Sequence, residues 1–440
     1  MSETKVPPFD VFEGGKTHDF KPRDPDEQFD DGQWAPDDEP ASKHPPLWAE
    51  PFRLPDEASI PRREWLYPGF LLRKFLSVTV APGGAGKSAL ALVEGVAMAS
   101  GNDLLGRGYD GVQRRVGIFN GEDPQDELAR RVFAIAKHNR MAGDAIGDRL
   151  FLESGRRVPL KFVVTEKAGP RLAVEAVDRF QEAIELGRLD VAIVDPLVTL
   201  TSAAETNEVM ELLSAELARI ADETGAAIHV VHHTRKPSPG SGGEITADDA
   251  RGGSALANKA RIVRVLNRMS KDEGERAGLD GHNHRRFFRL GSDKVNLTPP
   301  DADTSWHEIK SVRLANGPEN DPTHGDSMGV VTPWKWPDAF SDMPADCLGR
   351  AMAVARRGQD DGSPWKEDSQ ALEWIGYALA KEFRLDAYRE GRKVVGKDVA
   401  RLKSMIRQWI GSGAFAIEKR KDVKGNERPV IVEGILNAGE

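Results

Sequence analysis

The chain has 440 residues, of which 39% are hydrophobic and 30% are charged, a composition typical of two or three globular domains. No apolar run reaches membrane-spanning length, and the first residues lack the hydrophobic core of a signal peptide, so we expect neither a membrane protein nor a secreted one. The single cysteine, Cys347, excludes an internal disulfide and favours a cytoplasmic location.

The net charge of −9 arises entirely from the first 60 residues. Residues 1–60 hold fifteen Asp or Glu against six Lys or Arg, whereas the rest of the chain holds 55 residues of each sign. The same segment contains ten prolines, and such a composition cannot bury a core, so it is predicted to be a disordered acidic tail. The acidity therefore does not argue against a nucleic-acid partner for the folded part.

The stretch from Phe75 to Ser100 is predicted to be a buried strand, a glycine-rich turn and a helix. Glycines let backbone N–H groups surround a phosphate, and the helix start adds a positive dipole. In the P-loop pattern G-x-x-x-x-G-K-S/T, Lys87 reaches the β- and γ-phosphates and Ser88 binds Mg²⁺. The predicted nucleotide-binding residues are Ala81, Pro82, Gly83, Gly84, Ala85, Gly86, Lys87, Ser88 and Ala89, with Ala81 replacing the usual first glycine.

A second strand is predicted at Val116 to Asn120, followed by the sequence GEDP. In an open α/β sheet, ligands bind beyond the carboxyl ends of strands, so a carboxylate here can orient the water that attacks a phosphate. We assign this role to Glu122, and to Asp123 the N-cap of a helix with Pro124 in its first position. The alternative is that both acids only cap the helix.

A helix is predicted over residues 169–187, and a third strand over Leu189 to Val194 that ends at Asp195. An apolar strand followed by one aspartate is the Walker B pattern. Beside a P-loop, such an aspartate holds Mg²⁺ directly or through water.

An amphipathic helix over residues 203–224 precedes a fourth strand, 226–231, which leads into two histidines. With His229 they form H-x-x-H-H, a spacing that also suits zinc. No cysteine lies near, and strand alternation points His229 and His233 to one side and His232 to the other. Alternatively, a polar group at this strand end senses the γ-phosphate.

The next loop, 235–250, is rich in Gly, Ser and Pro and is predicted to be mobile. Arg261 and Arg264 follow in an alternating apolar and basic run, in which basic residues ordinarily form a solvated face. Further strands are predicted at 285–296 and 304–314.

Residues 316–345 are predicted to be a linker, because they are rich in proline and glycine. Residues 346–440 follow as a small winged-helix-like domain with three helices and two short strands. The stretch 392–428 holds eleven Lys or Arg against four Asp or Glu, which suits contact with duplex DNA phosphates. The alternative is a helical docking domain with a solvated basic face.

The motifs APGGAGKS, NGED, AIVDPL and VVHHTRK, followed by ARGGSALANKAR, resemble in their order the RecA-like ATPases. The resemblance is greatest to the RepA type of hexameric replicative DNA helicase from plasmids and phages, and it covers about residues 65–315. It implies an α/β fold with a RecA-like P-loop NTPase core at 61–315, flanked by the tail and the C-terminal domain.

The resemblance implies ATP and Mg²⁺ as cofactors. By position, Lys87 and Ser88 bind phosphate and metal, Glu122 looks like the base for the attacking water, and Asp195 looks like the Walker B acid. His233 looks like the γ-phosphate sensor.

The same resemblance implies a homo-hexamer around single-stranded DNA. Arg131 and Arg261 match arginines near the nucleotide, with Arg261 as a finger that enters a neighbouring subunit's site, and Lys294 matches a Lys-x-Asn pair. Loop 235–250 would face the central channel. Fast hydrolysis needs positive charge at the phosphates beyond that of Lys87, and no arginine lies within residues 81–88. An arginine from a neighbouring subunit would meet this need.

Three functions fit these motifs. The first is a ring-forming DNA helicase or translocase in plasmid or phage replication. The second is a non-motor, ATP-dependent regulator or loader that holds duplex DNA through its C-terminal domain. The third is a small-molecule kinase, which the absence of an evident acceptor-site motif disfavours.

Overall fold

The structure is a computed structural model that describes residues 51–234, 244–250, 254–277, 279, 282–295, 297, 304–318, 322–391, 393–421 and 426–435. The chain divides into two units that join at Pro61. In the first unit, a short helix η1 (Glu57–Ser59) is capped by the side chain of Asp56. Residues 1–50 of the predicted tail lie outside the described part.

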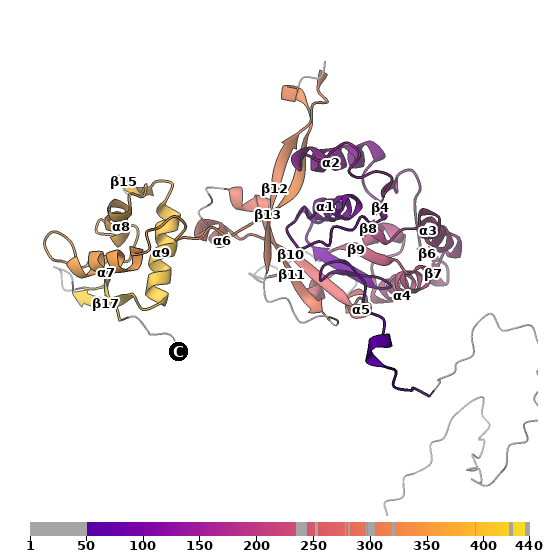
Figure 1. Ribbon diagram of the computed structural model, residues 1–440, viewed down its shortest axis with the longest axis horizontal. Helices are drawn as coiled ribbons and strands as arrows, with labels where there is room; N and C mark the ends of the chain where they lie inside the picture. Colours follow the sequence, from indigo (N-terminus) through magenta and orange to yellow (C-terminus); the bar gives the residue numbers. More distant parts are fainter. Residues whose placement is uncertain are drawn as a thin grey trace, which may run out of the picture. The chain divides into compact units, whose positions relative to one another are not determined.

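A nine-stranded sheet forms the centre of the second unit (Figure 1), in the order β13-β12-β11-β10-β3-β9-β8-β4-β5. The strands from β10 to β5 are parallel, and β11 to β13 continue the sheet in antiparallel fashion. Their bounds are β3 (Leu76–Ala81), β4 (Val116–Asn120), β5 (Leu150–Ser154), β8 (Val191–Asp195), β9 (Ala227–His233), β10 (Ile262–Arg268), β11 (Phe287–Val295), β12 (Ser305–Arg313) and β13 (Ser327–Trp334).

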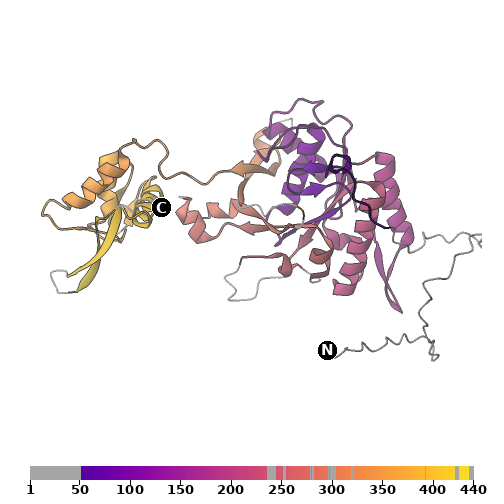
Figure 2. The same cartoon turned by 60° about the horizontal axis from the view of Figure 1, so that its bottom comes forward.

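Helices cover both faces of the parallel strands (Figure 1 and Figure 2). One apolar core joins the sheet to α1 (Lys87–Ser100) and α2 (Gln125–His138). A second core on the opposite face joins it to α3 (Val174–Gly187), α4 (Asn207–Thr224) and α5 (Ser254–Lys259). Because both faces are buried, the central strands are near-continuous apolar runs, which is why the sequence predicted them.

The antiparallel part of the sheet corrects the predicted linker at 316–345. Strand β13 pairs with β12 along its whole length and lies against α1 and α2. Beside it, the rings of Trp306, Trp334 and Trp336 form a cluster with centroids 5.4–6.0 Å apart. The linker prediction is therefore wrong for residues 327–334, whereas the other predicted domain boundaries remain predictions.

Short strand pairs complete this part of the chain. They are β1 (Trp65–Tyr67) with β2 (Leu71–Leu72), and β6 (Val163–Glu166) with β7 (Gly169–Leu172). Strand β7 corrects the helix predicted over 169–187, because that helix begins only at Val174.

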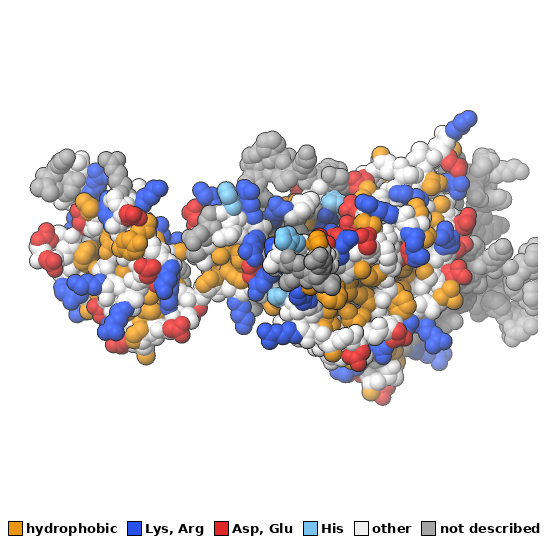
Figure 3. Space-filling model, turned by 90° about the horizontal axis from the view of Figure 1, so that it is seen from above, with side chains coloured by type: hydrophobic (Ala, Val, Ile, Leu, Met, Phe, Trp, Pro, Cys, Tyr) orange, Lys and Arg blue, Asp and Glu red, His pale blue; other side chains and the backbone are white. Residues whose placement is uncertain are grey.

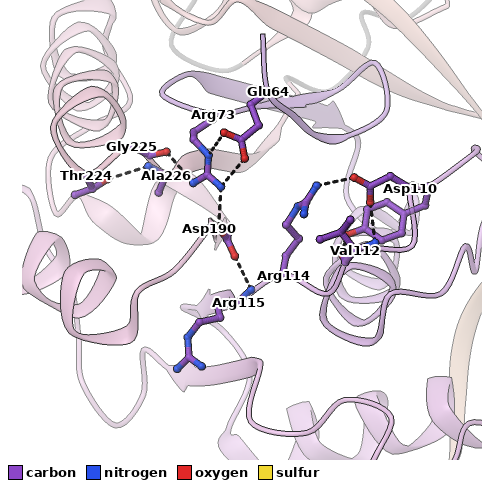
Figure 4. A network of polar contacts seen from close by, with 11 residues as sticks. Glu64, Arg73, Asp110, Val112, Arg114, Arg115, Asp190, Thr224, Gly225 and Ala226 are labelled. Atoms are coloured by element: carbon purple, nitrogen blue, oxygen red, sulfur yellow. Dashed lines mark hydrogen bonds and ion pairs between the residues drawn. The ribbon is translucent and has the colours of Figure 1, made fainter. Parts of the chain in front are cut away.

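Polar contacts tie together the amino ends of the central strands (Figure 4). The Arg73 guanidinium donates to Glu64, to Asp190 at 2.8 Å and to the Gly225 carbonyl at 3.2 Å. The other carboxylate oxygen of Asp190 accepts from the backbone N–H of Arg115 at 2.9 Å. This edge of the sheet is thereby closed by its own side chains, which leaves the carboxyl edge for a ligand.

The C-terminal residues have an apolar core of their own around Trp374, Trp409 and Phe415. Strands β14, β18 and β17 form a sheet in that order, and β15 and β16 form a hairpin. The bounds are α7 (Cys347–Arg357), β14 (Trp365–Lys366), α8 (Ile375–Phe383), β15 (Tyr388–Glu390), β16 (Lys393–Val395), α9 (Val399–Gly411), β17 (Phe415–Lys421) and β18 (Glu427–Glu433), with α6 (Lys271–Arg276) earlier in the chain.

Basic and acidic side chains are interspersed on the face drawn in Figure 3, so no extended field of one sign covers that face. Among the described residues, no helix is long and apolar enough to cross a membrane.

Candidate active site

The glycine-rich turn connects the carboxyl end of β3 to the first residue of α1. Gly84 and Gly86 have φ angles of 69° and 100°, a left-handed conformation that glycine adopts without steric cost. A Cβ on Gly86 would lie 2.8 Å from Ile309 Cδ1, so β12 packs closely against the turn. The free N–H groups and the dipole at the start of α1 therefore point to the carboxyl edge of the sheet, where an anion binds well.

Lys87, Ser88 and Asp195 converge at this edge. Lys87 is buried, and the Ser88 hydroxyl forms a hydrogen bond with the Asp195 carboxylate. Only 2% of Asp195 is exposed, and this burial raises its pKa to about 6. The Ser88 hydrogen bond and the Lys87 charge act in the opposite direction, whereas the nearby carboxylates of Glu122 and Asp123 raise the pKa further.

The residues here fit a magnesium ion. Asp195 Oδ1 is buried and has no hydrogen-bond partner among the described residues, and the Ser88 hydroxyl, which interacts with Asp195, would be a second oxygen ligand. Mg²⁺ bound to a phosphate chain is coordinated by oxygen ligands such as carboxylates and hydroxyls. Ser88 and Asp195 would hold the ion, which would neutralise negative charge on the phosphates.

Asn120 is a site residue that the sequence analysis missed. It pairs with Asp195 across β4 and β8, and its Nδ2 lies 3.5 Å from Asp195 Oδ2. Its Oδ1 accepts hydrogen bonds from the backbone N–H groups of Glu122, at 3.0 Å, and Asp123, at 2.7 Å. Asn120 thus shapes the turn that puts Glu122 beside Asp195. The asparagine before GED was the signal, because Asn side chains commonly bond the backbone two residues on.

The two acids of this turn have different surroundings. Glu122 is exposed, whereas Asp123 forms an ion pair with Arg131, with 3.1 Å between Oδ2 and Nη1. Helix α2 has Pro124 as its N-cap and no side-chain cap, so the prediction that Asp123 caps it is wrong. Arg131 also bonds Glu127 at 3.0 Å, which fixes its guanidinium behind the turn.

The histidines end β9 beside the P-loop strand. His233 pairs in register with Ala81, and strand alternation puts it on the α1 face of the sheet. His229 lies on the same face but deep in the core, where its Nε2 is 2.8 Å from Thr79 Oγ1. Burial lowers the pKa of His229 well below its ordinary value, so its ring is neutral. His232 is fully buried and alternation turns it to the opposite face.

Arg261 lies at the other end of the sheet from its own P-loop. Its backbone N–H donates to the Leu76 carbonyl at the amino end of β3, 3.2 Å away. At about 3.3 Å per residue, β3 separates this point from the P-loop by roughly 15–20 Å. Lys294 lies nearby and donates to the carbonyls of Ala257 and Asn258 at 2.8 and 3.0 Å, and burial together with the Arg261 charge lowers its pKa.

Two arginines within β10 make contacts that the sequence did not predict. Arg264 is not on a solvated face: it is 4% exposed and bonds both carboxylate oxygens of Glu94 on α1, at 2.5 and 2.6 Å. Arg268, the last residue of β10, donates from Nη2 to the carbonyl of Gly84, and Gly83 O lies 3.4 Å away. Neither contact can be deduced without knowing that β10 lies beside β3.

Part of the predicted channel surface lies outside the described residues. Loop 235–250 is described only from residue 244, and the asparagine of the Lys-x-Asn pair, Asn296, is also not described.

Residues 39–239 match the family model of the AAA domain. The chain carries a P-loop ATPase domain. The match includes the P-loop, the turn after β4, Asp195 and the histidines of β9, whereas β10 to β13 and the C-terminal helices lie beyond it. Nucleotide binding, typically with Mg²⁺, follows from a domain of this kind.

Proposed function

We propose that the protein is an ATP-driven DNA helicase or translocase that acts as a ring of identical subunits, of the RepA type, in plasmid or phage replication. The ATPase domain provides the first support. Lys87 binds the β- and γ-phosphates, Ser88 and Asp195 hold the metal, and Glu122 orients the attacking water. His233 lies where it can report the presence of the γ-phosphate.

The position of Arg261 is the observation that most supports assembly into a ring. Phosphoryl transfer needs positive charge at the γ-phosphate beyond that of the P-loop lysine. Arg261 lies at the amino edge of the sheet, too far from its own P-loop to supply that charge. In a closed ring of identical subunits, the same residue can enter the site of a neighbouring copy. Hydrolysis then depends on assembly, as in a homo-hexamer with single-stranded DNA in its channel.

The test combines steady-state ATP hydrolysis, with and without single-stranded DNA, with strand separation on a forked duplex and native mass. We expect DNA to stimulate hydrolysis, the fork to be separated and the mass to be that of a hexamer. The Lys87→Ala variant provides the background rate. Absence of both DNA stimulation and strand separation would rule out the motor.

A second candidate function is a non-motor ATP-dependent regulator or loader that binds duplex DNA. It is favoured by the C-terminal residues, where α9 precedes the β17–β18 hairpin and Lys419, Arg420 and Lys421 are exposed near the hairpin tip. A winged-helix domain uses such a helix and hairpin against the duplex.

Reversing two of these charges, Lys419→Glu with Lys421→Glu, separates the two functions in the full-length chain. A motor that needs only its channel retains DNA-stimulated hydrolysis. A regulator loses duplex binding, measured over a range of salt concentrations, and keeps its slow hydrolysis.

A further inference from the structure

The outer side of the P-loop carries a cation that the proposed mechanism does not use. Arg268 ends β10, the strand that runs parallel to β3, and its guanidinium reaches across to the loop. Nη2 donates a hydrogen bond to the carbonyl of Gly84 and lies 3.4 Å from that of Gly83. A Cβ on Gly84 would lie 2.8 Å from the same nitrogen, so a side chain at this position would push the guanidinium away from the carbonyl.

The contact closes one side of a tight turn. Residues Pro82 to Ala85 form this turn, in which the Ala85 N–H donates to the Pro82 carbonyl at 3.2 Å. In a planar trans peptide, the C=O and the N–H point in opposite directions. Arg268 therefore holds the Gly84 carbonyl outward while the Ala85 N–H on the same peptide closes the turn. The two interactions fix the conformation from which Gly86 and α1 present their N–H groups.

Among the described residues, Arg268 forms no ion pair with a carboxylate. The side chain is exposed, so its charge is not needed to satisfy a buried acid. Its position next to carbonyl oxygens is electrostatically favourable, and it adds positive potential to an anion-binding loop.

We infer that Arg268 is a positioning residue of the nucleotide site, which acts in cis by holding the P-loop turn in its phosphate-binding conformation. This deepens the proposed function and rests on it only for the identity of the nucleotide. Arg268 acts through the loop backbone, so it does not replace the arginine that a neighbouring subunit supplies. Because the loop surrounds the phosphates common to both nucleotides, ADP and ATP depend on Arg268 alike.

The experiment measures equilibrium binding of ADP and of ATP, the latter with hydrolysis blocked by Glu122→Gln, for Arg268→Ala and Arg268→Lys. We expect Arg268→Ala to weaken both nucleotides by about tenfold, the effect of one charge-assisted hydrogen bond, and Arg268→Lys to restore part of the loss. In chains with Glu122 intact, KM for ATP rises while kcat at saturation changes little. Arg276→Ala, which removes an exposed arginine from α6, is the matched control.

Three results would overturn the inference. Unchanged affinities for ADP and ATP would make the contact irrelevant to binding. A loss confined to ATP would mean that Arg268 touches the γ-phosphate directly. A fall in kcat without a change in affinity would assign it to the chemical step. ADP binding needs neither DNA nor a ring, so a wild-type protein that binds ADP but ignores DNA contradicts the motor and leaves this inference intact.

Discussion

Asp195 is a buried carboxylate whose ionisation is costly until a cation binds beside it. Burial raises its pKa from 3.8 to about 6, so in the metal-free protein it is neutral in mild acid and charged at neutral pH. Since the pKa is higher in the folded than in the unfolded chain, its contribution to stability is complete at low pH and is lost as the pH rises through about 6.

Asp195→Asn should therefore stabilise the metal-free protein at pH 8 and leave its stability nearly unchanged at pH 4. We expect a gain of about 3 kcal/mol in the free energy of unfolding at pH 8, measured by urea denaturation in EDTA. The exposed Asp144→Asn is the control. A destabilised Asp195→Asn protein at pH 8 would show that the ionised carboxylate is already compensated. The same variant should not hydrolyse ATP, because its amide oxygen is a poor metal ligand.

Glu122→Gln tests the residue assigned to the attacking water. The glutamine side chain has nearly the same shape as that of glutamate but cannot accept a proton, so we expect ATP binding to persist while turnover falls by about 100-fold or more. Binding and single-turnover hydrolysis are measured together, with the exposed Glu208→Gln as control. Normal turnover would remove Glu122 from the mechanism and leave the base unassigned.

At the scale of elements, a buried ion pair joins the P-loop helix to β10. Arg264 bonds Glu94 through two nitrogens, donates to Thr79 Oγ1 at 2.8 Å, and lies over the ring of Phe70, 3.4 Å from its centroid. Thr79 in turn bonds the neutral ring of His229. The network fixes the direction of α1 relative to the strand that carries Arg268.

Glu94→Ala should destabilise the protein by about 3–5 kcal/mol, because Arg264 is then a buried charge without a partner. The double variant Glu94→Leu with Arg264→Met should recover most of this loss, since both charges are removed together. Urea denaturation measures both changes. A single variant within about 1 kcal/mol of the wild type would show that water or another group compensates Arg264.

The elements that border the site could be predicted from the sequence, because buried parallel strands are apolar runs with an abrupt polar or glycine end. The strand ends at Ala81, Asn120 and Asp195 follow this pattern. The neighbours of those ends could not be predicted. Arg264 and Arg268 belong to a run whose alternation suits a solvated face equally well, and only the position of β10 beside β3 brings them to α1 and the P-loop.

At the scale of the whole molecule, the proposed ring assigns the two halves of one shared site to opposite ends of the same sheet. Lys87 begins α1 at the carboxyl edge, whereas Arg261 precedes β10 at the amino edge. A single copy cannot bring them together, because the length of a strand separates them. Two copies can do so when the amino edge of one meets the carboxyl edge of the next; such a head-to-tail interface forms a ring when its rotation closes, as we propose here.

Mixing two inactive variants tests this arrangement directly. Lys87→Ala and Arg261→Ala should each fail to hydrolyse ATP, but in an equal mixture about a quarter of the interfaces combine an intact lysine with an intact arginine. The measurement is the ATP hydrolysis rate of the mixture, after subunit exchange, against the rates of the separate variants. The account predicts a clear recovery of activity in the mixture. A mixture that stays at the rate of its inactive parents would contradict it.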